Sequence, residues 1–227
     1  MTVAFEDLAD HVLSVELDQS VAAVWQTMLS DDNDWLANQI ISFHLTRESV
    51  RAEIARTPED TKALAFQTVL RNRTLHGGIL APGSGVLKYG ENGKGIKSRW
   101  YPETLAKRIQ NIKLVRDKIS FVRGDGIETI KQYATRKTAT FFIDPPYTAA
   151  GKRAGTRLYV HNELDHADLF KQCERIQGDF LMTYDNAPEL ASMAHRHRFK
   201  TRTVRMKNTH HATMRELLIG KHLTWIR

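Results

Sequence analysis

Residues 140–147 read TFFIDPPY, and this stretch decides how the fold is interpreted. Its apolar opening is typical of a parallel strand that is covered on both faces. Pro145 and Pro146 have no backbone N–H to donate, so the strand over 140–143 is expected to end there, with Asp144 at its carboxyl edge. A carboxylate at the carboxyl end of a strand lies where open α/β sheets bind their ligands. Tyr147 adds an aromatic ring directly after this turn.

Together these groups have the chemistry needed to methylate an exocyclic amine. The lone pair of such an amine is delocalised into its base, so the nitrogen is a poor nucleophile. A carboxylate and a backbone carbonyl can accept both N–H bonds and favour a more nucleophilic nitrogen. An aromatic ring can stack on a base that has rotated out of a duplex. The alternative is a strand end with a proline turn and a core tyrosine.

Three segments carry a resemblance to a known family. The motif Asp-Pro-Pro-Tyr at 144–147 resembles the signature of amino-methyltransferases that use S-adenosylmethionine. Asn72-Arg73-Thr74, followed by a glycine-rich segment, resembles the DNA-recognition insertion of alpha-group N6-adenine-specific DNA methyltransferases. The run 215–219 (RELLI) resembles the family's C-terminal strand.

The resemblance implies a Rossmann-like class I methyltransferase sheet with a helical basic insertion. It implies methyl transfer from S-adenosylmethionine to N6 of a flipped adenine in double-stranded DNA, as in restriction-modification. Asp144 and the Pro145 carbonyl would hold the amine, Pro146 would stiffen the turn, and Tyr147 would stack on the base. Asp144 would also border the cofactor.

Two further acids are candidates for binding the cofactor. Glu16 ends an expected strand over 11–17, and the family has an acid at this position that accepts hydrogen bonds from the ribose hydroxyls. Asp18 is the alternative for that role, or else caps the next helix. Asp125 matches a family acid beside the cofactor's adenine, although a helix cap is an equally simple explanation.

The positive charge of the chain is concentrated in one block. The chain carries a net charge of +7, and residues 71–116 hold ten Lys and Arg against two acids. Such a block is expected to contact a polyanion, although it can also be a solvated surface. The predicted DNA-binding residues are Arg71, Arg73, Lys94, Lys97, Arg99, Lys152 and Arg153.

The order of the expected elements suggests three parts: residues 1–45 and 117–227 as catalytic α/β segments, and 46–116 as the inserted DNA-recognition part. A helix is expected to open at Thr57-Pro58. A strand over 119–122, a helix and the strand over 140–143 are expected to form one right-handed βαβ unit.

The family begins with a strand and a glycine-rich loop that passes close to the methionine part of the cofactor. This sequence has no glycine before Gly77. We therefore expect an N-terminally incomplete member, inactive alone and in need of a separate N-terminal fragment. The alternatives are a catalytically dead nucleic-acid-binding module, or an RNA or guanine amino-methyltransferase.

The remaining composition favours a cytoplasmic protein. The lone cysteine, Cys173, excludes an intramolecular disulfide framework and suits a reducing compartment. Neither a signal peptide nor an apolar run of membrane-spanning length is found in the sequence. Histidines 195, 197, 210 and 211 lack cysteine partners, so no metal site is expected.

Overall fold

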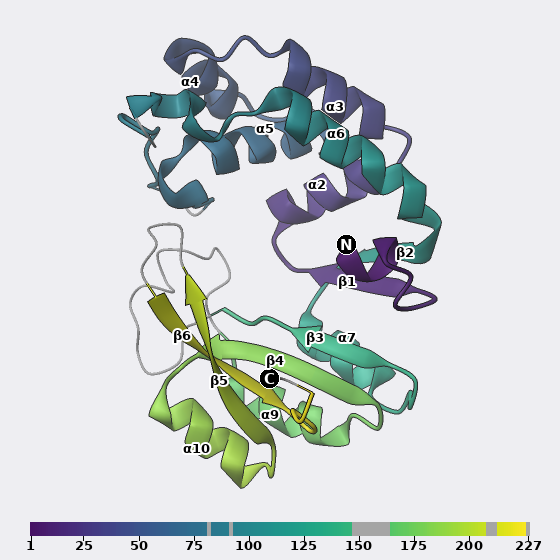
Figure 1. Cartoon of the computed structure of the whole chain (residues 1–227). Coiled ribbons are helices and arrows are strands. Elements are labelled where there is room, and N and C mark those ends of the chain that lie inside the picture. The colour runs from purple at the N-terminus through teal and green to yellow at the C-terminus, as the bar shows by residue number, and fades with distance from the viewer. Residues whose placement is uncertain (81–82, 91–92, 147–163, 208–212, 226–227) are drawn as a thin grey trace. The chain divides into compact units, whose positions relative to one another are not determined.

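The computed structural model describes residues 1–80, 83–90, 93–146, 164–207 and 213–225. The chain divides into two compact units, Met1–Gly124 and Asp125–Arg227, referred to below as unit 1 and unit 2. Both combine helices with a small sheet, so the architecture is α/β (Figure 1). One sheet is a parallel pair, and the other has four strands of mixed direction.

Unit 1 is mainly helical. Its helices and strands are α1 (Thr2–Phe5), β1 (Val12–Glu16), α2 (Gln19–Leu29), α3 (Asn33–Ser42), α4 (Arg47–Ala55), α5 (Thr61–Thr74), α6 (Pro102–Asn111) and β2 (Ile119–Arg123). Short 3-10 turns lie at η1 (His76–Gly78), η3 (Gly95–Arg99) and η4 (Ile112–Lys118). Strands β1 and β2 pair in parallel, with Val12 opposite Ile119.

One apolar core holds the helices α2 to α6 together. Leu36, Ile40, Val50, Phe66 and Leu70 are almost inaccessible to solvent and belong to a single cluster. The predicted parts 1–45 and 46–116 both contribute to this cluster, and unit 1 also contains residues 117–124. The inserted helices therefore complete the core of the N-terminal helices.

A buried amide fastens three of these helices. The Nδ2 atom of Asn33 donates to the carbonyl of Met28 at 2.7 Å and to that of Ile109 at 2.8 Å. These carbonyls lie near the C-terminal ends of α2 and α6, where helices leave acceptors without intrahelical partners. Burial favours a side chain that satisfies them, so Asn33 fixes the start of α3 against both ends.

One expectation for unit 1 changes in the structure. The helix expected to open at Thr57-Pro58 begins at Thr61, because the carboxylate of Asp60 accepts the backbone N–H of Ala63 at 2.8 Å and caps it. The described part of the glycine-rich segment forms 3-10 turns and a single antiparallel bridge between Leu75 and Val86.

Unit 2 is built around the four-stranded sheet. Its elements are α7 (Gly126–Tyr133), β3 (Thr140–Ile143), α9 (His166–Arg175), β4 (Asp179–Asp185), α10 (Pro188–Arg196), β5 (Lys200–Lys207) and β6 (Thr213–Gly220). The strand order is β3-β4-β6-β5, with β3 parallel to β4 and the other pairs antiparallel. The antiparallel C-terminal end therefore agrees with the sequence pattern.

The helices of unit 2 supply the cover for one face of this sheet. Side chains of α7, α9 and α10 share one cluster with Phe180, Met182, Tyr184, Leu217 and Ile219. These residues alternate along β4 and β6, so they point to the same face. Strand residues of the other parity, including Phe142 and Thr183, point to the opposite face.

Strand β3 differs from the expected fully covered strand. Phe142 is 69% exposed, whereas Phe141 and Ile143 pack against the helical side of the sheet. Among the described residues β3 pairs with β4 alone, and β2 pairs with β1 in the other sheet. The βαβ unit expected from β2, α7 and β3 is therefore not contained in either sheet.

A close backbone approach sets the register of β3 and β4. The N–H of Asp179 donates to the carbonyl of Ala139 at 3.1 Å. A Cβ atom at the preceding residue, Gly178, would lie 2.0 Å from that carbonyl oxygen. Only glycine fits there without moving the backbone. The fixed register brings the carboxyl ends of the two strands together.

Candidate active site at the carboxyl end of β3

The carboxylate of Asp144 lies directly after β3 and is oriented by the neighbouring strand. The hydroxyl of Thr183 on β4 donates to Asp144 Oδ1 at 2.6 Å. Thr183 is buried, whereas Asp144 is exposed. By their positions along the strands, the side chains of both residues lie on the face of the sheet opposite to α7, α9 and α10. The carboxylate is thus held at the sheet edge by a rigid donor, as a ligand-binding acid requires.

The two prolines support this position. Strand β3 ends at Ile143, as the sequence predicted, and Pro145 is buried while Pro146 is half-buried. Their fixed φ angles limit the freedom of the turn that carries Asp144. Tyr147, the last member of the motif, lies outside the described residues. The structure therefore places three of the four predicted catalytic residues.

A second polar pair lies at the end of β4, on the helical side of the sheet. The Tyr184 hydroxyl and His166 Nδ1 are hydrogen-bonded at 2.7 Å, and the Tyr184 ring is fully buried. Burial raises the pKa of Tyr184 well above its usual value, and burial lowers the pKa of His166. The pair therefore stays uncharged at neutral pH and anchors α9 to the sheet.

Glu16 ends β1 at the carboxyl end of the parallel pair, as predicted. Its Oε1 atom accepts the backbone N–H of Asp18 at 2.9 Å. Asp18 in turn caps α2, since its Oδ1 accepts the N–H groups of Ser20 and Val21 at 2.7 and 3.0 Å. Of the two acids considered for the ribose, Asp18 is thus occupied as the helix cap. Glu16 is the half-buried acid at the strand end.

Asp125 is the N-cap of α7. Its Oδ1 atom accepts the backbone N–H of Ile127 at 2.6 Å and that of Glu128 at 3.3 Å. The preceding residue, Gly124, donates its N–H to the carbonyl of Glu16 at 3.1 Å within unit 1. Asp125 and Asp144 belong to unit 2 and Glu16 to unit 1. Glu16 is therefore described in a different unit from Asp125 and Asp144.

The cap of Asp125 leads to a stability prediction. Asp125→Ala should lower the free energy of unfolding by about 1 kcal/mol, because two N–H groups lose their acceptor. Asp125→Ser retains a capping oxygen and should cost only about a few tenths of that energy. Urea denaturation followed by circular dichroism measures both. Equal destabilisation by Ala and Ser would show that Asp125 stabilises the fold by something other than the cap.

Two of the predicted DNA-binding arginines brace the backbone of the glycine-rich segment. Arg71 Nη2 donates to the carbonyl of Leu80 at 3.0 Å, and Arg99 Nη2 donates to the carbonyl of Leu75. Arg71 Nε is buried without a hydrogen-bond partner among the described atoms. Each guanidinium has five N–H donors, so these contacts leave capacity for an anion.

The other predicted cations differ in exposure. Arg73 is half-buried, whereas Lys94 and Lys97 are exposed. Lys152 and Arg153 lie outside the described residues. Elsewhere in the basic block, Lys113 pairs with Asp34 and Arg116 pairs with Asp31, so part of its charge is neutralised internally. The cations without an acidic partner are the better candidates for phosphate contacts.

The described residues fit S-adenosylmethionine only in part. Glu16 supplies a carboxylate suited to a ribose diol at the end of a parallel strand. Strand β2 runs into a short turn with two glycines, Gly124 and Gly126, at the start of α7. No other described strand is followed by closely spaced glycines of the kind that let backbone approach the methionine portion. The same residues contain no group of three or more His, Cys, Asp or Glu placed to hold a metal ion.

Thr183 is the site residue that sequence reasoning missed. The pairing of β3 with β4 could have indicated Thr183, since the carboxyl ends of two parallel strands lie side by side.

In the described part of the chain, no helix combines the length and apolarity needed to cross a bilayer. No protein-family model matches the chain, and no curated protein matches it. The proposed function therefore depends on the chemistry of the described residues.

Proposed function

We propose that the chain is an S-adenosylmethionine-dependent N6-adenine DNA methyltransferase with a Rossmann-like sheet. The observation that carries this proposal is the Asp-Pro-Pro turn after β3, where the Thr183 hydroxyl orients the Asp144 carboxylate at 2.6 Å. A strand-end carboxylate supported by prolines is what a site for an exocyclic amine requires. The resemblance of residues 144–147 to the amino-methyltransferase signature supports the same conclusion.

The roles of the residues follow from the charge that develops on the amine. When bound, the cofactor supplies an electrophilic methyl group on a sulfonium. Asp144 and the Pro145 carbonyl accept the amine's N–H bonds, so the nitrogen lone pair is directed away from the ring. When the nitrogen accepts the methyl group, the methyl–sulfur bond would break, a neutral thioether would leave and the nitrogen would become positively charged. A fixed carboxylate stabilises that charge more than it stabilises the neutral amine, and the nitrogen would then lose one N–H proton, for which Asp144 is an acceptor. Tyr147 stacks on the extruded adenine.

Binding of the cofactor requires a segment beyond those described. Glu16 can hold the ribose, and Asp125 follows Gly124, whose N–H donates to the Glu16 carbonyl. In the described residues β1 pairs only with β2, and β3 pairs only with β4. Open edges of this kind accept a further strand through backbone hydrogen bonds. We propose that a separate fragment with an apolar strand and a glycine-rich turn adds to such an edge.

The partner that suits the basic block is double-stranded DNA. Lys94 and Lys97 are exposed and positively charged, and phosphate contacts supply most non-specific affinity for DNA. Burial raises the pKa of the Cys173 thiol to about 12, so this cysteine is unreactive and takes no part in a covalent mechanism. An unmodified thiol also fits the reducing cytoplasm proposed as the location.

A second candidate function is a catalytically dead nucleic-acid-binding module, favoured by the absence of a glycine before Gly77. Methylation of RNA or of guanine uses similar chemistry at the same turn. These alternatives share the basic block and differ in whether the cofactor binds and in which base is modified.

Calorimetric titration with S-adenosylmethionine separates the two classes. The chain alone should bind weakly or not at all, because Glu16 offers a contact to the ribose alone and the segment before Gly77 has no glycine for the methionine portion. Adding a synthetic segment with an apolar strand and a glycine-rich turn should raise the affinity, and Glu16→Gln should reverse that gain. If the cofactor fails to bind even with the segment present, the binding-module function is correct.

A further inference from the structure

Unit 1 contains a cavity that the proposed amine site does not use. It has a volume of about 300 Å³ and lies among α2, α5 and α6. Its wall is mostly apolar, with Val24, Trp25, Val69 and Leu80 among the lining residues. Thr68 and Asn72 add polar groups. This volume is at the lower end of the range found for small-molecule sites.

Arginines converge on the same cavity. Arg73 and Arg108 line it, and Arg73 is half-buried while Arg108 is exposed. Burial lowers the pKa of Arg73, and the nearby charges of Arg99 and Arg108 lower it further. The ion pairs of the described residues include none of these three arginines. The guanidiniums of Arg73 and Arg108 lie beside an apolar wall, and the charge of Arg99 acts on Arg73, so the site has unbalanced positive charge.

An anion would relieve this repulsion. Guanidiniums bind phosphate through paired N–H donors, and they do so best when partly removed from water. An inorganic ion would satisfy the charge but leave the apolar wall empty. The ligand that satisfies both features has a flat apolar body attached to a phosphate.

We infer that this cavity binds a nucleoside phosphate, with the base against Trp25 and Val69 and the phosphate at Arg73 and Arg108. A single base with its sugar is compatible with the volume, and Thr68 and Asn72 can hydrogen-bond to the base edge. The nucleotide is either free or an unpaired residue of a nucleic-acid strand. The second source rests on the proposed function, whereas the first does not.

The test is calorimetry of the full chain at low salt with three probes: 2′-deoxyadenosine 5′-monophosphate, deoxyadenosine and inorganic phosphate. The monophosphate should bind at least about tenfold more tightly than either half alone, because stacking and charge contribute together. Val69→Phe fills the cavity and Arg108→Gln removes one cation, and each should weaken monophosphate binding about tenfold or more.

Arg116→Gln is the matched control, because it removes the same charge from a half-buried arginine that pairs with Asp31 and does not line the cavity. It should leave the affinity for the monophosphate within about twofold. Arg108 is exposed, so its replacement reports on the cavity even if Val69→Phe prevents folding, which a thermal melt would reveal. No monophosphate binding, or binding that Arg108→Gln and Val69→Phe leave unchanged, overturns the inference.

A final pair of ligands distinguishes a free nucleotide from an unpaired nucleotide within a strand. A duplex with one unpaired adenosine and a fully paired duplex of the same length are titrated with the parent chain and Val69→Phe. Selective weakening of the bulged duplex assigns the cavity to a nucleotide within a strand. Equal affinities, together with monophosphate binding, assign it to a free nucleotide. Because no probe requires methyl transfer, failure of the inference leaves the role of Asp144 unaffected, and the reverse also holds.

Discussion

Asp144→Ala should reduce methyl transfer by at least about 100-fold while leaving affinity for duplex DNA unchanged. The carboxylate acts on a charge that appears as the amine attacks, so its removal should affect the chemical step and not the binding of DNA. The assay is single-turnover incorporation of tritiated methyl groups into an adenine-containing duplex. It uses the chain together with the synthetic segment that carries an apolar strand and a glycine-rich turn. Duplex affinity is measured in parallel by fluorescence anisotropy.

Matched variants separate the parts of the turn. Thr183→Val removes the hydroxyl that orients Asp144 and should slow transfer, whereas Thr183→Ser should retain most of the rate. Tyr147→Phe should also remain active, because stacking uses the ring face, and Tyr147→Ala should weaken capture of the extruded base, followed by 2-aminopurine fluorescence. Transfer at the parent rate by Asp144→Ala, or complete inactivity of Tyr147→Phe, would show that these roles are assigned wrongly.

The second large expected effect is on the salt dependence of DNA affinity. Replacing Lys94, Lys97 and Lys107 together by Gln should weaken binding to every duplex sequence and flatten the dependence of affinity on salt. These lysines are exposed, and the ion pairs of the described residues do not include them. For every lysine that touches a phosphate, its replacement should reduce the slope of log affinity against log salt concentration by about 0.9.

The same number of charges can be removed elsewhere in unit 1. Lys113, Arg116 and Lys118 pair with Asp34, Asp31 and Asp7, so replacing them by Gln should leave the slope nearly unchanged. Affinities are measured by anisotropy between low and physiological salt. A slope that stays the same in the first triple variant, or falls equally in both, would make the basic block a solvated surface without specific phosphate contacts.

The sequence was most informative where local chemistry determines structure. The end of β3 at Ile143 follows from Pro145 and Pro146, which cannot donate to a sheet. The helical spacing of Leu105, Ile109, Ile112 and Val115 also matches their burial, although the segment continues from α6 as the 3-10 turn η4 and not as regular helix. The cap at Asp18 likewise depends on residues only two and three positions away.

Features that depend on distant residues were not predictable. Thr183 reaches Asp144 only because Gly178 lets β4 start close to Ala139, and no local pattern records that register. The exposure of Phe142 depends on which neighbours cover β3, which an apolar run cannot reveal. Helix α4 was missed because Val50 and Ile54 are its only large apolar residues, too few to show a helical period.

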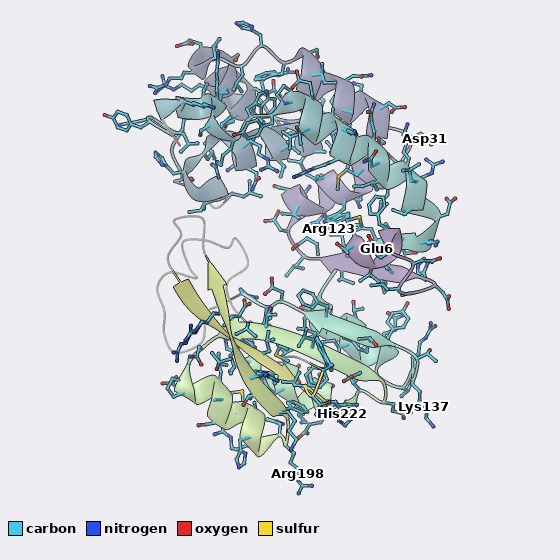
Figure 2. The ribbon with its side chains drawn as sticks, viewed as in Figure 1. Glu6, Asp31, Arg123, Lys137, Arg198 and His222 are labelled. Carbon is cyan, nitrogen blue, oxygen red and sulfur yellow. The ribbon has the colours of Figure 1, made fainter. Side chains whose placement is uncertain are left out.

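The sequence also did not show which Lys and Arg side chains are held by contacts within the protein and which can contact DNA. Figure 2 shows Asp31 and Arg123 among the many charged side chains at the surface of unit 1. Lys62 pairs with Asp32 and lies over the Trp35 ring, and Arg99 holds the Leu75 carbonyl. Such contacts depend on packing, so a count of Lys and Arg overestimates the charge available to DNA.

The central claim is that the Asp-Pro-Pro turn presents an adenine amine for methylation. The most direct measurement is mass spectrometry of the nucleosides from duplex DNA after a reaction. The reaction contains S-adenosylmethionine, the chain and the synthetic segment that carries an apolar strand and a glycine-rich turn. The account predicts N6-methyladenine in that reaction and at least about 100-fold less with Asp144→Ala. Cofactor and DNA that both bind without yielding any methylated adenine, or a methyl group found on another base, would contradict it.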